Sequence, residues 1–490
     1  MIARRFKKQT MQKSYLRYWI LTVSTVLMTL IYANNVAFNF TIICMIPEES
    51  DSVPMNEVKY VSGNNATAKP VPQSLKAHYD YSPLQRNMLF SATAAGTLLG
   101  GLPLAFFADK FGVRKTYTMY SVMSGAATLF LPLSASIDYV ALFAVRVIQG
   151  IGLAPIYVML SSVSAEWATV ATTGSYLICL SAMFQFGPIM TIPTAGLLCE
   201  SELGWPAVYY IQGVLTLVLT ALFFFLFRDS PVFHPAITEK ELKTIQRGKV
   251  MSKKSLRVVE KVPYTSIIKD PIVWVTLYAF FGDELGYQIF QQYGPIFLNK
   301  AHGMSVHETG FAATIPYMLA LLTKLIIGPV SDRITIASDR MRINVFSIIS
   351  QGGAAICFVI LALLPMLFGK VPIWIVQVFY SSVNLFCGVG FLGVLKSSEI
   401  IAQHFSHVLM AWESIISSLI VLILPLAINV IAPKNTVEEW SRVFIGVPCI
   451  QILAITAFVL FCDSKPRKWT GVDIDSRQSE SSSEAGLEKY

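Results

Sequence analysis

The sequence predicts an all-α membrane protein with twelve transmembrane helices in two six-helix halves, the arrangement of the major facilitator fold. Apolar residues make up 54% of the 490 positions and charged residues only 14%, whereas a soluble domain averages about 25% charged residues. Long apolar runs recur along the chain, and one polar stretch near the middle divides them into two groups of six. Because most of this chain cannot face water, a soluble enzyme or a nucleic-acid-binding module is excluded.

Each predicted helix rests on an apolar run long enough to cross a bilayer, which takes roughly 20 residues for a core of about 30 Å. The first run follows a basic tail and is too long for a cleaved signal peptide, so it is expected to be a membrane anchor. The twelve predicted spans lie near 19–46, 84–107, 115–134, 138–162, 172–198, 204–227, 271–297, 308–332, 342–368, 372–394, 407–432 and 441–462.

The segments between the spans predict the domain organisation and the orientation. Basic residues gather in both tails and in alternate loops, and the central loop carries ten Lys/Arg against five Asp/Glu. Such loops face the cytosol, so we expect both termini there. The expected order is a basic tail 1–18, an N-terminal half 19–227 with an outer loop 47–83, a central loop 228–270, a C-terminal half 271–462 and a polar tail 463–490.

The outer loop 47–83 is acidic and contains Asn65-Ala66-Thr67, which is a sequon for N-glycosylation. The seven cysteines lie inside or at the ends of apolar runs, and no CxxC pair or Cys/His metal spacing occurs. We therefore expect the cysteines to be small buried apolar residues, Cys199 to have no partner, and the protein to hold no metal or other cofactor. The chain also lacks GxSxG, HExxH and P-loop motifs, so an enzyme or an ATP-driven pump is not expected.

The two halves share a weak repeat. The turn after the second span reads FADKFGVRK, and the turn after the eighth reads GPVSDRITIASDR, with Asp109 and Asp332 at equivalent places. Duplicated halves with a substrate site between them are a recurring plan of membrane transporters.

Several segments in order carry a more specific resemblance. These are RVIQGIGLAPIYVML, GWPAVYYIQGV, DSPVFHPAITEKEL and ETGFAATIPYMLALL, together with the FADKFGVRK turn. They resemble the anion/cation symporter family of the major facilitator superfamily, which includes sodium–phosphate cotransporters, sialin and vesicular glutamate transporters. The resemblance covers roughly residues 17–470. It implies secondary active transport by alternating access, and a gating role at the cytoplasmic turns for Asp109, Arg114, Asp332 and Arg333, although these are also ordinary charges of cytosolic loops.

The departures from that family concern its charged residues. Organic-anion carriers of the family have an arginine in the first helix where this chain has Asn35, and a glutamate in the fourth helix where it has Leu153. An arginine of the seventh helix corresponds to Gly282, and a histidine of the second helix corresponds to Phe90, while the arginine at Arg146 is kept. The resemblance therefore implies the fold more firmly than it implies an organic-anion substrate.

Arg146 lies within the fourth predicted span, followed at helical spacing by Gln149 and Tyr157. A charge inside a membrane helix usually faces a cavity or a partner. One interpretation is a contact with an anionic substrate in a central cavity, together with Gln149 and Tyr157. The other is a structural ion pair with an acid of the seventh helix.

The seventh span holds two adjacent acids, Asp283 and Glu284, near its middle. A polar stripe runs along one face of the same span, through Glu284, Tyr287, Gln288 and Gln291. A carboxylate in a cavity could bind a coupling ion, Na⁺ or H⁺, or pair with a cationic substrate. Alternatively, one acid neutralises Arg146 and the other meets a neighbouring helix. The adjacent acids point about 100° apart, so both are not expected to face one cavity.

Two further polar stripes are candidates for the cavity wall or for bonds between helices. The first includes Tyr32, Asn35 and Asn39, and the second Gln377, Ser381 and Asn384. Structural roles are expected for Lys324, which would snorkel toward the cytosol, and for Glu413.

The function that these observations favour is a monomeric secondary transporter, ion-coupled or driven by the membrane potential, in the lipid bilayer of the plasma membrane or of an intracellular vesicle. Its partner would be a small solute, with an anion favoured because Arg146 is kept. The lost arginines and gained acids instead favour a cationic or neutral solute. A membrane sensor or scaffold that keeps the fold without transport is the other alternative.

Overall fold

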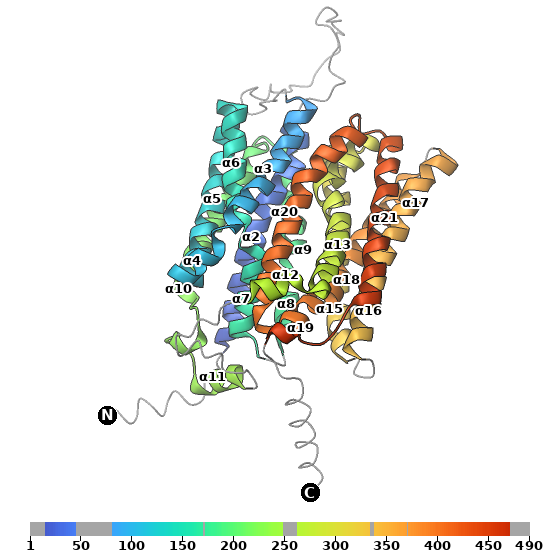
Figure 1. Ribbon diagram of the computed structural model, residues 1–490. Coiled ribbons are helices and arrows are strands. Elements are labelled where there is room, and N and C mark those ends of the chain that lie inside the picture. The colour runs from blue at the N-terminus through green and yellow to red at the C-terminus, as the bar shows by residue number, and fades with distance from the viewer. Residues whose placement is uncertain are drawn as a thin grey trace, which may run out of the picture.

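A computed structural model describes residues 15–45, 81–169, 172–247, 262–333, 338–369 and 371–470. Within these ranges the chain is helical, and no β-strand occurs. All twelve expected spans are helical, so the predicted fold class is confirmed (Figure 1). The predicted outer loop, including the sequon at Asn65, lies almost entirely outside the described residues.

In the described residues the first six expected spans correspond to nine helices, because three of the spans are interrupted. They are α2 (Leu16–Met45), α3 (Pro83–Gly101) with α4 (Leu104–Phe111), α5 (Val113–Ile137), α6 (Tyr139–Leu153) with α7 (Ile156–Trp167), α8 (Thr173–Ser181) with α9 (Met183–Glu200), and α10 (Pro206–Leu226). The α6–α7 interruption lies next to Pro155, whose ring cannot donate a backbone hydrogen bond.

The central segment and the last six spans follow in the same way. The central segment holds η4 (Pro231–Phe233), α11 (Glu239–Gln246) and α12 (Tyr264–Lys269). The seventh to ninth spans are α13 (Pro271–Ile296) with η6 (Phe297–Ala301), α14 (Val306–Ala312) with α15 (Ile315–Arg333), and α16 (Asp339–Ser347) with η7 (Ile348–Gly352) and α17 (Gly353–Phe368). The tenth to twelfth spans are α18 (Ile373–Gly390) with η8 (Phe391–Leu395) and α19 (Lys396–Ala402), α20 (Ser406–Ile431), which follows the short η9 (Gln403–Phe405), and α21 (Val437–Phe461). The last described element is η10 (Lys468–Thr470).

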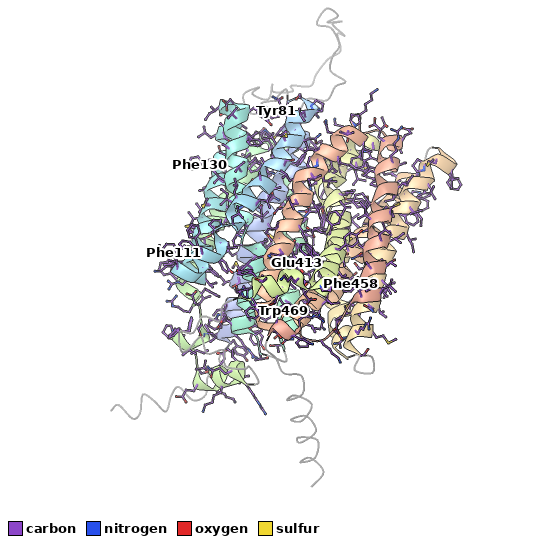
Figure 2. All side chains as sticks on the ribbon, viewed as in Figure 1. Tyr81, Phe111, Phe130, Glu413, Phe458 and Trp469 are labelled. Carbon is purple, nitrogen blue, oxygen red and sulfur yellow. A yellow bond between two sulfur atoms is a disulfide. The ribbon has the colours of Figure 1, made fainter. Side chains whose placement is uncertain are left out.

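Within the described residues, ten of the twelve helical segments are both long and apolar enough to cross a membrane. The remaining two are α3 with α4, and α13, which carries Asp283, Glu284 and several glutamines. Large apolar side chains such as Phe111 and Phe130 are exposed on the outer surface of the helices (Figure 2). An apolar exterior around a bundle that keeps charged residues of its spans, such as Arg146 and Glu413, inside is the arrangement that a lipid environment requires.

The helices pack as two groups that lie side by side (Figure 1). In the first group α5 packs against α6 and α10, and α2 against α9 and α10; in the second, α17 packs against α21, α15 against α18, and α13 against α20 and α21. The groups meet where α3 and α7 contact α20, where α2 contacts α13, and where α9 contacts α14 and α15. The end of the bundle where α2 begins and α21 ends is called the terminal end below, and the end where α2 ends and α3 begins is called the opposite end.

Two glycines allow the closest helix contact of the first group, between α3 and α6. A methyl group at Gly150 would collide with the carbonyl oxygen of Thr93, and one at Gly96 with that of Val147. Small residues of this kind let membrane helices approach backbone to backbone.

One sequence expectation is wrong at the cysteines. Cys44 and Cys199 form a disulfide, with their Cα atoms 6.1 Å apart. The two residues are 155 positions apart in the chain, but α2 packs along α9, so their last turns meet at the opposite end. Cys179 and Cys449 are also not buried but exposed, and the other three free cysteines are buried as expected.

Candidate functional site

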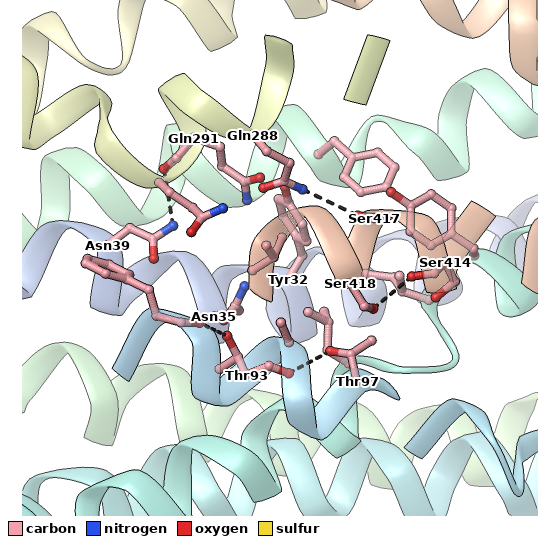
Figure 3. Close-up of a pocket in the computed structure, with 18 residues that line it drawn as sticks. Tyr32, Asn35, Asn39, Thr93, Thr97, Gln288, Gln291, Ser414, Ser417 and Ser418 are labelled. Carbon is pink, nitrogen blue, oxygen red and sulfur yellow. Dashed lines mark hydrogen bonds between the residues drawn. The ribbon is translucent and has the colours of Figure 1, made fainter. Parts of the chain in front are cut away.

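A cavity lies between the two groups of helices near the middle of the bundle (Figure 3). The side chains that line it come from α2, α3, α6, α7, α9, α13 and α20, and none of them carries a formal charge. They are Tyr32, Asn35, Asn39, Phe90, Thr93, Ala94, Thr97, Leu153, Ile156, Tyr157, Phe184, Gln288, Gln291, Gln292, Ser414, Ser417, Ser418 and Val421. The wall is thus a mixture of apolar rings and neutral hydrogen-bonding groups, which suits a small polar solute.

Hydrogen bonds join the two groups of helices around this cavity. The hydroxyl groups of Tyr32 on α2 and Tyr287 on α13 are 3.2 Å apart. Asn39 Nδ2 donates to the carbonyl oxygen of Gln291 at 3.2 Å. Movement of one group against the other therefore changes the polar contacts of the cavity wall itself.

The structure places the predicted binding residues at different depths from the cavity. Asn35, Tyr157, Gln288 and Gln291 line it. The other predicted residues do not line it, and they are Arg146, Gln149, Glu284, Tyr287 and Asn384. Most of this second set lies directly behind the wall, as the contacts below establish.

Arg146 is fully buried behind Asn35. Its Nη1 donates to Gln149 Oε1 at 2.6 Å, and its guanidinium carbon lies 4.3 Å from the ring centre of Phe38. Its Nη2 lies 3.5 Å from Asn35 Oδ1, and that long bond connects it to the cavity wall. No acid pairs with Arg146 in the described ranges, so the alternative of an ion pair with the seventh span is wrong.

Gln149 fixes Arg146 from the other side. Its Nε2 donates to the carbonyl oxygen of Asn34 at 2.8 Å and to Thr128 Oγ1 at 2.9 Å, which leaves Oε1 to accept from the guanidinium. The positive charge is therefore held by neutral groups of the first six spans. A buried cation held only by neutral acceptors keeps its field, which reaches the cavity.

Glu284 also lies one layer behind the wall, on the side of the second group. Its Oε1 accepts from Gln288 Nε2 at 2.7 Å and from Ser417 Oγ at 2.6 Å, and both donors line the cavity. Of the predicted stripe on this helix, Glu284 and Gln288 therefore form a hydrogen-bonding unit with Ser417 of α20 at the cavity.

Asp283 points away from that unit, as expected for adjacent residues of a helix. Its Oδ1 accepts from Ser350 Oγ at 2.9 Å, and its Oδ2 lies against the backbone of Gly390 on α18. Helix α13 is continuous through Gly282 and Gly286. A side chain at Gly282 would collide with Ala454, and one at Gly286 with Gln451, so the two glycines allow α13 to pack closely on α21.

The stripe on α18 contacts other helices and does not line the cavity. Gln377 Nε2 donates to the carbonyl oxygen of Ala312 at 2.8 Å and to Ser381 Oγ at 3.1 Å. Asn384 is buried, and neither amide atom of its side chain has a hydrogen-bond partner in the part of the chain that the structure describes.

The sequence and the fold of this chain are similar to those of known proteins. Residues 60–398 match the Major Facilitator Superfamily. The chain belongs to this superfamily. The predicted resemblance is confirmed, since the relatives include members of the same symporter group at low identity.

Three relatives and one solved structure show how similar this superfamily member is to known proteins. Sodium-dependent phosphate transport protein 1 of Homo sapiens is 24% identical over 412 residues, which is 83% of this chain and 86% of that protein. Sialin of Ovis aries is 22% identical over 76% of this chain and 74% of its own length, and the probable small intestine urate exporter of Homo sapiens 23% identical over 80% and 78%. A bacterial homologue of the human lysosomal transporter Spinster, solved in an inward-facing and unoccupied conformation, has a TM-score of 0.59 at 15% identity, covering 92% of this chain and 97% of that one.

The superfamily turn after the second span is described in part. Gly112 adopts φ +85°, and a side chain there would collide with the carboxylate of Asp229. Asp229 Oδ1 accepts from the backbone nitrogen of Arg114 at 2.6 Å, and Arg114 Nε donates to the carbonyl oxygen of Phe224 at 2.7 Å. These contacts tie the turn to α10. The side chains of the other three predicted gating residues, Asp109, Asp332 and Arg333, lie outside what the structure describes.

Sequence reasoning missed the contribution of α20 to the cavity. Ser414, Ser417 and Ser418 recur at helical spacing within an otherwise apolar run, which is the signal that could have found them. It also misplaced Lys324, which does not snorkel toward the terminal end. Lys324 Nζ donates to Gln185 Oε1 of α9 at 3.0 Å, across the boundary between the two groups.

Proposed function

We propose that this protein is a secondary active transporter that carries a small anionic solute across a membrane by alternating access. The observation that carries the proposal is the cavity between the two groups of helices, whose polar wall is built from both. A site at such a boundary can open to one side and then to the other as the halves rock against each other.

The anion is supported by two considerations. The relatives are named for phosphate transport and for urate export. Arg146 lies behind Asn35, so a rotation of that amide would let an anion approach the guanidinium. The field of a buried cation attracts an anion into the cavity even without direct contact.

A neutral polar solute is the second candidate. It is favoured by the absence of charged side chains from the cavity wall among the described residues, where amides and hydroxyls offer both donors and acceptors. A cationic solute has less support, because Gln288 and Ser417, which donate hydrogen bonds to Glu284, lie between that acid and the cavity.

We also propose that both termini face the cytosol, with helical halves at 19–227 and 271–462 and with Na⁺ or H⁺ as the coupling ion. The Cys44–Cys199 disulfide supports this orientation. It lies at the opposite end, and disulfides persist on the extracellular or luminal side rather than in the reducing cytosol. Glycosylation at Asn65, a monomeric state and residence in the plasma membrane or a vesicle membrane belong to the same proposal, as does a gating role for the charged cytosolic turns.

The test is flux into liposomes that contain the purified protein. Radiolabelled phosphate and organic anions form one panel, and neutral and cationic solutes form the other, each with and without Na⁺ and H⁺ gradients. We expect anion uptake that falls by at least about tenfold in Arg146→Gln, as expected for the loss of one charge contact. The control is Arg442→Gln, which removes an exposed charge of α21.

Each other outcome has a defined meaning. Uptake of neutral solutes alone, unchanged in Arg146→Gln, would replace the anion by the second candidate. Saturable binding of a solute without flux under every gradient would identify a sensor that keeps the fold.

A further inference from the structure

Glu413 is a buried acid about two turns into α20, near the terminal end, with an incomplete set of partners. It lies on α20 with an exposed fraction of 0% (Figure 2). Its Oε1 lies 2.5 Å from Ser398 Oγ of α19, while its Oε2 has no hydrogen-bond partner within the described residues. The carboxyl group thus has one neighbour that can donate, although an ionised carboxylate can accept about four hydrogen bonds.

The charged and titratable groups around Glu413 do not neutralise it. The neighbours that act on it electrostatically are the acids Glu399 on α19 and Glu284 on α13, together with the phenol of Tyr157 on α7. Lys396, the cation on α19, interacts with Glu399. Of the ion pairs in the described part of the chain, none includes Glu413.

Protonation of Glu413 would remove this unfavourable buried charge. Burial of an ionised carboxylate without a cation is strongly unfavourable, and two nearby acids add repulsion. The protonated acid needs only one acceptor for its O–H group. Ser398 Oγ can serve as that acceptor, since its own hydroxyl also lies 3.5 Å from the carbonyl oxygen of Val394.

Glu413 is close enough to the cavity for its charge to matter there. Ser417 lies four residues further along α20, on the same helical face, and both Ser414 and Ser417 line the cavity. Four residues of an α-helix span about 6 Å along its axis. At such a distance a negative charge on Glu413 would oppose the binding of an anion.

The two acids expected from the sequence are better compensated than Glu413, Glu284 by two donors and Asp283 by one donor and the nearby charge of Lys324. Glu284 accepts hydrogen bonds from Gln288 and Ser417, and both its donors belong to the cavity wall. Asp283 accepts from Ser350 and lies on the side of the helix away from that wall. Each of them can remain ionised at a lower free-energy cost than Glu413, whose Oε2 has no hydrogen-bond partner among the described residues.

We propose that Glu413 is the site that binds the coupling proton. On the side where substrate enters, a proton from water adds to a carboxylate oxygen of Glu413 and forms an O–H bond. The loss of that negative charge allows the anion to enter the cavity, so proton and anion cross together. On the other side the O–H bond breaks, the proton returns to water and the anion leaves. This inference rests on the proposed anion transport and specifies its coupling.

The experiment separates coupling from transport by two assays on the same liposomes. One measures accumulation of radiolabelled phosphate, or of the anion that proves active, against its gradient under an imposed pH gradient. The other measures exchange of internal for external anion at equal pH on both sides, which needs no release of the proton. The variants are Glu413→Gln, which is a permanent mimic of the protonated acid, and Glu413→Asp, which can still titrate.

In Glu413→Gln we expect proton-driven accumulation to fall by at least about tenfold, while exchange stays within about threefold of wild type and becomes independent of pH. Glu413→Asp should retain part of the accumulation. The matched control is Glu438→Gln, which removes an exposed acid from the first turn of α21, and should leave both assays unchanged.

Three outcomes would overturn the assignment. They are normal proton-driven accumulation in Glu413→Gln, accumulation in wild type that responds to Na⁺ but not to H⁺, and equal loss of exchange and accumulation in both Glu413 variants, which would make the residue structural. If wild type moves no anion in either assay, the proposed substrate class fails instead. The same two assays with the neutral solute that it does carry then decide the role of Glu413.

Discussion

Lys324 of α15 donates to Gln185 of α9, and the two atoms lie 3.0 Å apart across the boundary between the two groups of helices. The same ammonium lies 3.4 Å from both the carbonyl oxygen and the hydroxyl of Ser181, where α8 ends. A cation at the end of a helix is favoured by the carbonyl groups exposed there. This contact must break whenever α15 moves away from α8 and α9.

We predict that Lys324→Met shifts the protein toward conformations that are open at the terminal end. The readout is the rate at which a maleimide labels a cysteine introduced at Ser161, which is buried and lies 3.3 Å from Ser406 across the same boundary. Labelling should accelerate about five- to tenfold, which corresponds to roughly 1 kcal/mol in the equilibrium. Lys324→Arg, which keeps a donor, should label at nearly the original rate. An unchanged rate in Lys324→Met would show that the contact does not hold the two groups together.

A second prediction concerns the contact between α3 and α6. Gly150→Ala should lower stability by about 1–3 kcal/mol, since the new methyl group collides with backbone atoms of α3 rather than with a flexible side chain. The measurement is the thermal unfolding midpoint in detergent. Gly101→Ala on α3 is the matched control, because nothing lies within 4 Å of its added carbon. Equal midpoints for the two variants would contradict the tight packing.

The disulfide gives a third prediction. Cys44→Ser should destabilise the protein by roughly 2–4 kcal/mol, the range typical of a removed cross-link. Reductant should lower the unfolding midpoint of wild type and leave that of the variant unchanged. Cys449→Ser removes an exposed free cysteine and serves as the control. A wild-type midpoint that does not respond to reductant under unfolding conditions would argue that the bond is absent.

A fourth prediction concerns the start of α13, where the last described residues of the chain contact it. Asp270 Oδ1 accepts from the backbone nitrogen of Ile272 at 3.0 Å, and Oδ2 accepts from Arg467 Nε at 2.7 Å and from Trp469 Nε1 at 2.9 Å. Burial alone would raise the pKa of Asp270, but the hydrogen bonds from Arg467, Trp469 and Ile272 outweigh it and the net shift is downward.

Because the pKa of Asp270 is lower in the folded protein than in the unfolded chain, its stabilising effect is present above the unfolded value of about 3.9 and is lost as the pH falls through the folded value. Arg467→Gln should therefore unfold at a lower temperature than wild type at pH 7, and the difference should shrink toward pH 3. Lys468→Gln alters the neighbouring charge and is the control. A difference that does not depend on pH would exclude the carboxylate as the source.

The spans could be predicted because each rests on local composition alone. Runs of about 20 apolar residues define them wherever they occur, and the seventh span was among these runs although it carries Asp283 and Glu284. What could not be predicted depends on pairs that are distant in sequence. Cys44 and Cys199 illustrate this, because only the packing of α2 on α9 brings them together.

The residues of the candidate site could largely be predicted from the sequence, but not which of them line the cavity and which lie behind its wall. Periodicity placed Glu284, Gln288 and Gln291 on one face, and that face does look toward the cavity. It could not indicate that Gln288 and Ser417 stand in front of Glu284, or that Arg146 is held by Gln149 instead of an acid. Those distinctions depend on side chains from different helices, whose relative rotation a single sequence does not specify.

The position of the disulfide also has a consequence for how the protein is made. Cys44 lies in the last turn of α2 and Cys199 in the last turn of α9, so during synthesis Cys44 cannot pair with Cys199 until four further spans have been inserted. The cross-link can close only when α9 has docked against α2. Its formation in a nascent chain therefore marks the moment at which the first group of helices has assembled, and a chain stalled before that point is recognisable by a free thiol at Cys44.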